Sequence, residues 1–143
     1  MPRFIPLCIF LIFVFFGCED KKETESPCAD CGMEITSDLP QVDGIYQLTY
    51  NPNLAQTYES LYAETNCGWS QHIRWDSNYL YEVAGQQINL VNPGSMTDDD
   101  GNAQVIFAVW LPFIGYTITI YGAYEDDCGT SHTDSIKVKI NDY

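Results

Sequence analysis

Basic residues and histidines are scarce in this sequence of 143 residues. It has 6 Lys and Arg against 20 Asp and Glu, with 2 His, so that its net charge at pH 7 is −14. A field of this sign repels the phosphates of nucleic acids and the headgroups of anionic lipids. The composition therefore argues against nucleic acid as a partner.

Recognisable catalytic motifs are also missing. The sequence contains no Gly-x-Ser-x-Gly elbow, no phosphate-binding glycine loop and no His-Glu-x-x-His helix. A pair of carboxylates can hydrolyse glycosides, but a small β-domain offers little cleft for such a pair. We therefore expect no enzymatic activity.

No apolar run is long enough to cross a bilayer as a helix, which takes roughly 20 residues. The longest run, residues 7–16, follows Arg3 and ends just before Gly17. A positive start and a short apolar run are typical of a secretory signal. We predict that residues 1–17 are a signal peptide that is removed on export.

Cys18 follows this segment directly. The order of charge, apolar run, small residue and cysteine resembles the signal of bacterial lipoproteins, although Phe15 and Phe16 stand where smaller residues are commoner. The resemblance implies cleavage before Cys18 and lipid on that cysteine, and each buried CH₂ of the lipid would contribute about 0.8 kcal/mol to anchoring. The alternative is an ordinary signal peptide with an incidental cysteine.

Residues 19–27 read EDKKETESP and lack large apolar side chains. Such a segment cannot bury enough surface to offset its ordering entropy, which indicates a flexible tether. The charged run 19–23 also resembles a surface-export signal of some Gram-negative bacteria. We predict a lipidated, acidic tether with a CxxC over residues 18–33 and one domain over 34–143, on an outer-membrane lipoprotein that is periplasmic or exposed at the cell surface.

The domain is predicted to be all-β, since it is rich in Tyr, Ile, Val, Thr and Trp with turn signals between short runs. Residues 115–124 and 133–140 alternate apolar and polar side chains with the period of two of a half-buried strand. Residues 53–65 also fit an amphipathic helix, but the tyrosines and threonines favour a strand. The other expected strands are 43–50, 71–75, 86–91 and 103–110.

About seven such strands indicate an immunoglobulin-like antiparallel β-sandwich. Residues 75–140 are similar to the polycystic-kidney-disease-type branch of that superfamily. Trp75-Asp76 stands where the family has a Trp-Asp pair on its third strand, and Phe113, Gly115 and Tyr116 precede a threonine-alternating strand. The family's aromatic-Gly-Asp-Gly continuation after Trp-Asp is absent. Under any sandwich prediction, Trp75 belongs to the core.

Four cysteines remain after the signal peptide and the lipidation site, and in an exported protein we expect them to form disulfides. In the predicted sandwich, Cys67 and Cys128 follow strands that end on the same side of the domain. A Cys67–Cys128 bond would close a loop of about 60 residues and contribute roughly 4 kcal/mol. Cys28 and Cys31 would then pair with each other.

A copper site is the alternative for the CxxC. Cys28, Cys31 and Met33 present two thiols and a thioether within six positions, and soft sulfur ligands select Cu(I). The string Cys-x-x-Cys-Gly-Met resembles the motif of periplasmic copper-chaperone lipoproteins that serve nitrous oxide reductase. This resemblance implies a copper-handling lipoprotein.

Two other metal hypotheses are weaker. A zinc site could use Cys67 with His72 and Cys128 with His132, but these pairs are too far apart in sequence for a finger-like site. The acidic segment 97–102 suggests calcium, but it lacks the spacing of an EF-hand loop. We expect a solvated turn there.

The function expected from the sequence is that of a membrane-anchored, non-catalytic binding or structural module of the cell envelope, without a cofactor. Its 10 Tyr and 3 Trp offer side chains for a contact surface that binds an envelope protein or a glycan. The triplet containing Ser135 resembles a bacterial O-glycosylation acceptor. Copper handling through the CxxC is the alternative function.

Overall fold

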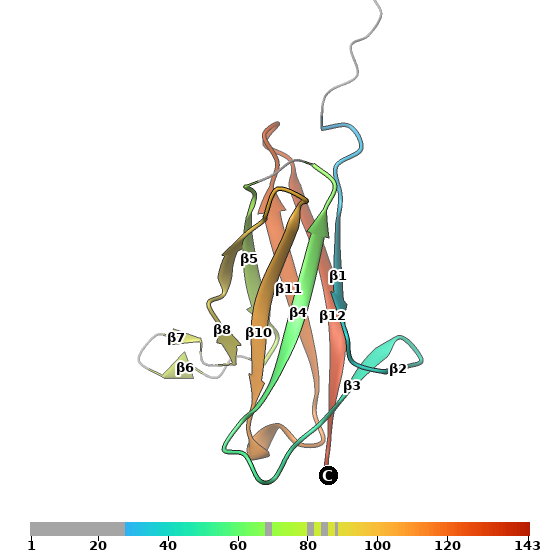
Figure 1. The fold of residues 1–143 in the computed structure, drawn as a ribbon, viewed down its shortest axis with the longest axis vertical. Helices are drawn as coiled ribbons and strands as arrows, with labels where there is room; N and C mark the ends of the chain where they lie inside the picture. The colour runs from blue at the N-terminus through green and yellow to red at the C-terminus, as the bar shows by residue number, and fades with distance from the viewer. Residues whose placement is uncertain (1–27, 68–69, 80–81, 84–85, 88) are drawn as a thin grey trace, which may run out of the picture.

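Two β-sheets pack face to face in the structure, a computed structural model that describes residues 28–143 except 68–69, 80–81, 84–85 and 88 (Figure 1). Within the described residues, seven strands have five or more residues and five have two or three. The elements are β1 (Met33–Ser37), β2 (Gln41–Val42), β3 (Ile45–Thr49), β4 (Thr57–Thr65), β5 (His72–Ser77), β6 (Glu82–Val83), β7 (Gln86–Gln87), β8 (Leu90–Val91), β9 (Gly94–Met96), β10 (Asn102–Val109), the 3-10 helix η1 (Leu111–Phe113), β11 (Thr117–Glu125) and β12 (Ser131–Asn141).

The smaller layer is a four-stranded sheet in the order β1-β4-β10-β8, and the larger has the order β2-β3-β12-β11-β5-β9. The short strands β6 and β7 pair only with each other. Neighbouring strands are antiparallel except β3 and β12, which are parallel. The predicted all-β sandwich is confirmed.

The core lies between the layers, because alternate residues of the long strands face inward. In β5, for example, Ile73 and Trp75 are buried while Arg74 and Asp76 are exposed. Trp75 is 3% exposed, which confirms its predicted place in the core. The largest fully buried side chains are Tyr124, Phe107, Phe113, Leu61, Ile73, Leu90, Ile118, Ile120 and Ile140.

The ambiguous segment 53–65 contains a strand, so the helical alternative is wrong. β4 pairs with β1 on one side and β10 on the other. Leu61 and Ala63 face the core, whereas Tyr58 and Tyr62 are exposed on the outer face. The alternation of inward and outward side chains therefore outweighs the helical spacing of the apolar residues, because β4 pairs with a strand on each side.

The first strand of the sandwich lies earlier than predicted. β1 precedes the expected first strand at 43–50 and begins at Met33, and its Ile35 is buried in the core. The predicted strand 86–91 is divided, because β7 and β8 belong to different sheets. At residue 115 the backbone φ of +90° turns the chain, so β11 begins only at Thr117.

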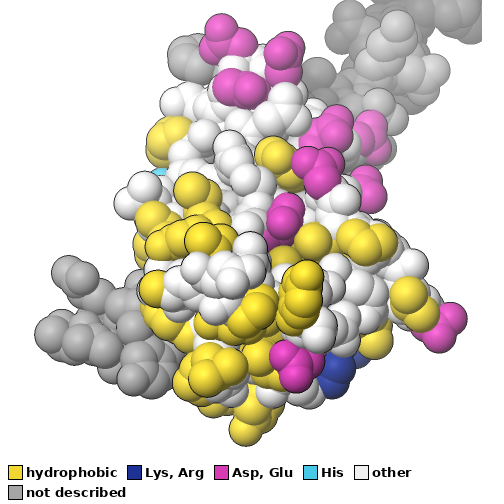
Figure 2. All heavy atoms as spheres, turned by 60° about the horizontal axis from the view of Figure 1, so that its bottom comes forward, with side chains coloured by type: hydrophobic (Ala, Val, Ile, Leu, Met, Phe, Trp, Pro, Cys, Tyr) yellow, Lys and Arg dark blue, Asp and Glu magenta, His cyan; other side chains and the backbone are white. Residues whose placement is uncertain are grey.

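The two ends of the sandwich differ in the side chains that they expose. We call the end with Cys28, Cys31, Cys67 and Cys128 the cystine end, and the end with the loop 50–56, η1 and the C-terminus the far end (Figure 1). Hydrophobic side chains gather over the far end, whereas acidic side chains are prominent toward the cystine end (Figure 2). Within the described residues, no helix has the length and apolar character to cross a membrane.

Candidate functional site

The ladder between β1 and β4 brings the first cysteine pair together. Met33 lies opposite Thr65 in this ladder. Cys31 is two residues before Met33 and Cys67 two residues after Thr65, so the two cysteines extend the same register. They form a disulfide with a Cα–Cα distance of 5.1 Å, within the range that a disulfide spans. This bond fixes the start of β1 to the four-stranded sheet.

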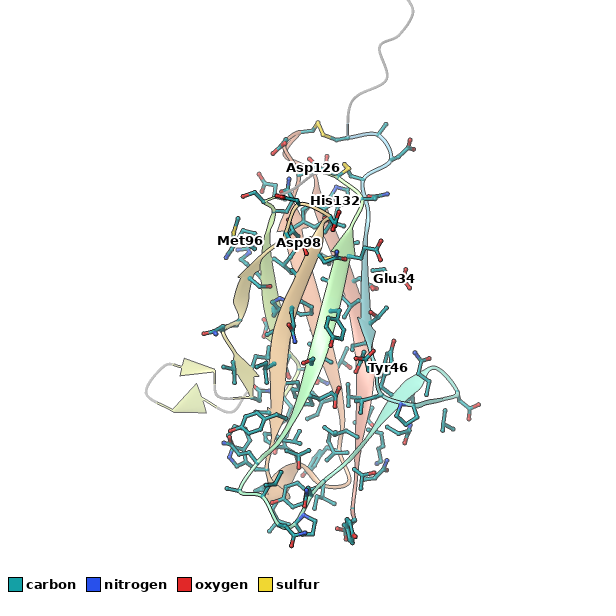
Figure 3. The ribbon with its side chains drawn as sticks, viewed as in Figure 1. Glu34, Tyr46, Met96, Asp98, Asp126 and His132 are labelled. Carbon is teal, nitrogen blue, oxygen red and sulfur yellow. A yellow bond between two sulfur atoms is a disulfide. The ribbon has the colours of Figure 1, made fainter. Side chains whose placement is uncertain are left out.

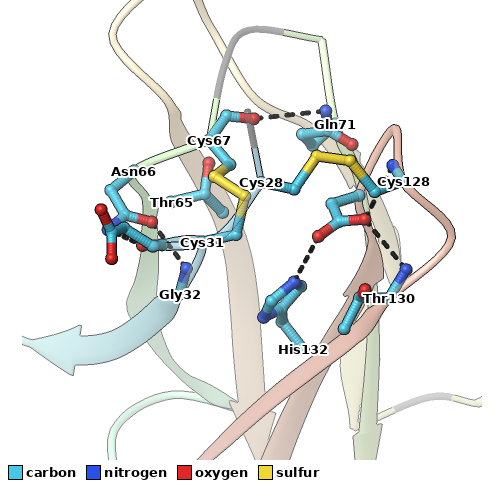
Figure 4. Close-up of a disulfide and its surroundings, with 12 residues drawn as sticks. Cys28, Cys31, Gly32, Thr65, Asn66, Cys67, Gln71, Cys128, Thr130 and His132 are labelled. Carbon is cyan, nitrogen blue, oxygen red and sulfur yellow. Dashed lines mark hydrogen bonds and ion pairs between the residues drawn. A yellow bond between two sulfur atoms is a disulfide. The ribbon is translucent and has the colours of Figure 1, made fainter. Parts of the chain in front are cut away.

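The second disulfide joins Cys28 to Cys128 over a Cα–Cα distance of 6.3 Å. Cys128 lies in the turn between β11 and β12, in the six-stranded sheet. The N–H of Cys31 donates to the carbonyl of Cys28 at 3.2 Å, which makes a tight turn of the CxxC. The segment before β1 is therefore bonded covalently to both sheets (Figure 4).

The disulfide pairing predicted from the sequence is wrong, although all four cysteines are disulfide-bonded as expected. Cys67 and Cys128 do lie at the same end, but they pair with Cys31 and Cys28 instead of with each other. The prediction missed β1, which carries the CxxC to that end. The alternation of Met33-Glu-Ile-Thr-Ser was the signal that could have revealed this strand.

Asp126 organises the turn that carries Cys128. Its side chain is almost fully buried, and its Oδ1 accepts hydrogen bonds of 2.9 Å from the N–H groups of Cys128 and Thr130. Its Oδ2 lies 2.7 Å from Nε2 of His132 (Figures 3 and 4). The hydrogen bond with His132, followed by that from Thr130, lowers the pKa of Asp126. The carboxylate is thus ionised and fully engaged at neutral pH.

Tyr124 links this pair to the N-terminal segment. Its ring stacks on the imidazole of His132 with centroids 4.9 Å apart, and its hydroxyl donates to the carbonyl of Gly32 at 3.1 Å. Burial, with a smaller contribution from the charge of Asp126, raises the pKa of the Tyr124 phenol. The contacting side chains of Asp126, His132 and Tyr124 therefore connect the β11–β12 hairpin to the start of β1, beside the disulfides.

A hollow of about 340 Å³ opens among these groups. Its lining consists of the four cysteines with Asn66, Asp126 and Asp127. The side chain of Asn66 closes one wall, since its Oδ1 accepts from the N–H of Gly32 at 2.6 Å and its Nδ2 donates to the carbonyl of Asp30 at 2.7 Å. The wall and the disulfides together hold the CxxC turn in one conformation.

Two groups of possible metal ligands lie at this end, each with its ligand atoms within 4.8 Å of one another. They are Cys28, Asp126 and Cys128, and Cys31, Asp126 and His132. In both groups the sulfur atoms are already bonded in disulfides. Since the thiolate is the form that binds metals, the oxidised protein offers no thiolate ligand here.

The ligands of the predicted copper site are committed to other contacts. Cys28 and Cys31 are bonded to two different cysteines. Met33 packs against the core, with its Cε 3.3 Å from where a Cβ at Gly122 would lie. Cys28, Cys31 and Met33 therefore do not form a free set of sulfur ligands in this state.

The other predicted site residues do not belong to this cluster. His72 is on the outer side of β5, beside Gly94 of β9, and in the described part of the chain it joins no group of metal ligands. The acidic segment 97–102 is a turn, in which Oδ1 of Asp98 accepts from the backbone N–H groups of Asp100 and Asn102. Cys18 lies outside the described residues.

Comparison with known proteins identifies the fold alone. No protein-family model matches the chain, and no relative is found among curated proteins. The ASH/PapD-like domain of human CEP192 (PapD-like domain 7) is similar with a TM-score of 0.53 and 12% identity, over 86% of this chain and 92% of that one. The E. coli chaperone DraB gives a TM-score of 0.43 and 13% identity, over 75% of this chain and 53% of that one. The chain is thus an immunoglobulin-like or PapD-like β-sandwich.

Proposed function

We propose that this chain is an exported bacterial lipoprotein, anchored to the outer membrane by lipid on Cys18, whose sandwich is a non-catalytic binding module of the cell envelope. The observation that carries the proposal is the pair of disulfides at the cystine end. Disulfides form and persist in oxidising compartments outside the cytoplasm. They agree with the export signal predicted at residues 1–17.

The position of the disulfides suits an anchored domain. Cys28, the first described residue, lies only ten positions after Cys18, and a flexible chain of that length spans roughly 18 Å. The domain would thus stay close to the membrane. Because both sheets are bonded to the segment before β1, tension on the tether would act on the whole sandwich, while the far end and the sheet faces stay accessible.

The contacts of the Asp126–His132 pair support a structural role for it. Asp126 and His132 resemble a catalytic pair in type, but the Asp126 oxygens are occupied by the N–H groups of Cys128 and Thr130 and by His132. The pair therefore stabilises the hairpin. We also propose the polycystic-kidney-disease-type branch for the domain, on the resemblance of the Trp75-Asp76 pair, which lies on β5; the burial of Trp75 is expected of any such sandwich.

Substitution of Cys18 tests the anchor. We expect the wild-type protein in the membrane fraction, with mass spectrometry showing a lipidated N-terminus at Cys18, and we expect Cys18→Ser to lose both properties. Cys8→Ser is the matched control, since that cysteine lies within the apolar run of the predicted signal. An intact N-terminus, or cleavage elsewhere with Cys18 unmodified, would overturn the proposal.

Copper handling is the second candidate, favoured by the sulfur, carboxylate and imidazole groups that converge near Asp126. It requires that the disulfides be reduced in the cell. A thiol count on protein purified from an oxidising compartment separates the two functions. We expect no free thiols; four free thiols, or co-purifying copper that is lost on Cys31→Ser, would favour the copper protein instead.

A further inference from the structure

Among the described residues of this acidic protein, the cationic side chains lie on one surface. In the part of the chain that the structure describes, the cationic side chains are Arg74 on β5 and Lys137 and Lys139 on β12, all in the six-stranded sheet. They point away from the core, because their neighbours Trp75 and Val138 are buried. The outer face of the six-stranded sheet therefore carries all the cationic side chains of the described residues.

Two of these cations have no partner among the residues that the structure describes. The Arg74 guanidinium and the Lys137 ammonium make no ion pair or hydrogen bond within the described residues. Lys139 donates to the carbonyl of Gly115. Acidic side chains on the same face are Asp76 and Glu125. Arg74 and Lys137 are therefore available to an anionic ligand.

A hollow of about 530 Å³ lies on this face beside Arg74. Its lining residues are Arg74, Trp75, Asp76, Tyr121, Gly122, Ala123 and Thr133. The ladder explains its shape, since Ala123 lies between Arg74 and Thr133 and its methyl group leaves the space that a larger side chain would fill. The ring of Tyr121, which is 44% exposed, stands at the next outward position of β11.

Two hydroxyl side chains, Tyr121 and Thr133, line the hollow. Tyr121 lies between Asp76 and Ser135 in the ladder, so an aromatic ring, a carboxylate and a hydroxyl group share one row. Further hydroxyl side chains, Thr117, Thr119 and Ser135, face outward along β11 and β12 on the same sheet face. Hydroxyl groups both donate and accept hydrogen bonds, as the hydroxyls of a sugar do.

We propose that this face binds an acidic polysaccharide, one whose sugar rings carry carboxylates; the inference rests on the proposed function as a binding module. Arg74 would hold a carboxylate through two parallel hydrogen bonds, and the Tyr121 ring would contact the C–H groups of a sugar ring. Asp76 and the hydroxyl groups would bond the sugar hydroxyls.

Charge complementarity selects an acidic glycan over a neutral one. The described part of the four-stranded sheet has acidic residues and no Lys or Arg, so of the two outer sheet faces the one with Arg74 and Lys137 is the more favourable for a polyanion. The two sheets lie about 10 Å apart, which is also the Debye length at 0.1 M salt. Because side chains on the two outer faces point in opposite directions, their charges are separated by more than this length, and the acidic residues of the opposite face are therefore largely screened from a ligand bound here.

The test is a calorimetric titration of the full mature lipoprotein, in non-ionic detergent, with an oligogalacturonate of defined length. We expect saturable binding that weakens at least tenfold when salt is raised from 50 to 500 mM. A neutral glucose oligomer of the same length should bind at least tenfold more weakly. No binding of the oligogalacturonate, or equal binding of the neutral oligomer, would overturn the inference.

Substitutions of two residues that line the hollow test whether the ligand binds there. Arg74→Gln and Tyr121→Ala should each weaken binding about tenfold without changing the unfolding midpoint by more than a few degrees. Tyr62→Ala is the matched control, because Tyr62 is a comparably exposed tyrosine on the outer face of the other sheet. An equal loss of binding in Tyr62→Ala would disprove the assigned face. The Cys18 experiment tests the anchored module separately, so the two failures are distinguishable.

Discussion

The cystine end and the far end stabilise the same sandwich by different physical means. At the cystine end, two disulfides, the Asp126–His132 pair and several backbone hydrogen bonds fix the segment before β1. At the far end, aromatic rings pack around Phe113, with centroid distances of 5.0 Å to Tyr79 and 5.5 Å to Trp110. The far end also exposes apolar side chains such as Leu54 and Leu111.

This difference in stabilisation agrees with a domain that is anchored to the membrane through the segment at its cystine end. The end next to the proposed anchor is cross-linked to both sheets, so it cannot open while the disulfides are intact. The far end depends on burial of apolar surface, which stabilises by about 25 cal/mol per Å². We therefore expect the two ends to respond differently to reduction, to core substitution and to acid.

The largest expected effect comes from removing the Cys28–Cys128 disulfide. Its sequence separation is 100 residues, for which the chain-entropy model gives about 4.7 kcal/mol of the free energy of unfolding. Cys31–Cys67 has a separation of 36, which gives about 3.8 kcal/mol. Denaturant unfolding of the double variants Cys28→Ser/Cys128→Ser and Cys31→Ser/Cys67→Ser measures both losses. A larger loss for the second variant would contradict this order.

At the far end, Phe113→Ala tests the aromatic packing. Phe113 is 2% exposed, and truncation of a buried phenylalanine to alanine costs roughly 3–5 kcal/mol. Leu111→Ala is the control in the same short helix, because Leu111 is 65% exposed and should cost no more than about 0.5 kcal/mol. Since distant sites are usually additive, the Phe113 loss should be the same with either disulfide removed. Strong coupling would show that the two ends are not independent.

The same substitution of a glycine at each end compares how closely the backbone is packed there. Gly101 and Gly115 have φ values of +85° and +90°, a conformation that costs an alanine about 1–2 kcal/mol. A Cβ at Gly101 would lie 2.3 Å from the carbonyl oxygen of Thr65, whereas nothing lies within 4 Å of one at Gly115. We expect Gly115→Ala to cost about 1 kcal/mol and Gly101→Ala about 3 kcal/mol, measured by denaturant unfolding. Equal costs would exclude the backbone contact as the cause.

How much could be predicted from the sequence differs between the two ends. Alternation within β11 and β12 is local, so these strands, the buried Trp75 and the sandwich itself followed from the sequence. The cysteine pairing is not local. It depends on the register of β1 against β4, which no residue of the CxxC specifies.

The Asp126–His132 pair was missed for a related reason. Glu125 to Asp127 looks like a solvated acidic turn, and only the fold shows that the middle carboxylate points inward to meet His132. The hollow beside Arg74 likewise depends on which strands become neighbours. Pairing between strands placed the small Ala123 next to Arg74, and sequence spacing alone does not determine such pairing.

The smallest expected effect is a response to acid that belongs to the cystine end alone. The hydrogen bond with His132 lowers the pKa of Asp126 below its ordinary value of 3.8. Because the ionised form is favoured in the folded state, its stabilisation is complete above about pH 4 and is lost as the pH falls through the folded pKa. The free energy of unfolding of the wild type should therefore fall more steeply below pH 4 than that of Asp126→Asn.

Asp127→Asn is the matched control for this response, because Asp127 is the exposed neighbour of Asp126 in the same turn. Its free energy of unfolding should keep the acid slope of the wild type, and so should that of Phe113→Ala, whose substitution lies at the far end. At neutral pH, Asp126→Asn should be less stable than the wild type by less than either disulfide removal, since an amide can still accept the N–H groups of Cys128 and Thr130. Identical acid slopes for Asp126→Asn and Asp127→Asn would mean that the buried carboxylate does not distinguish the two ends, and that the disulfides alone set the cystine end apart.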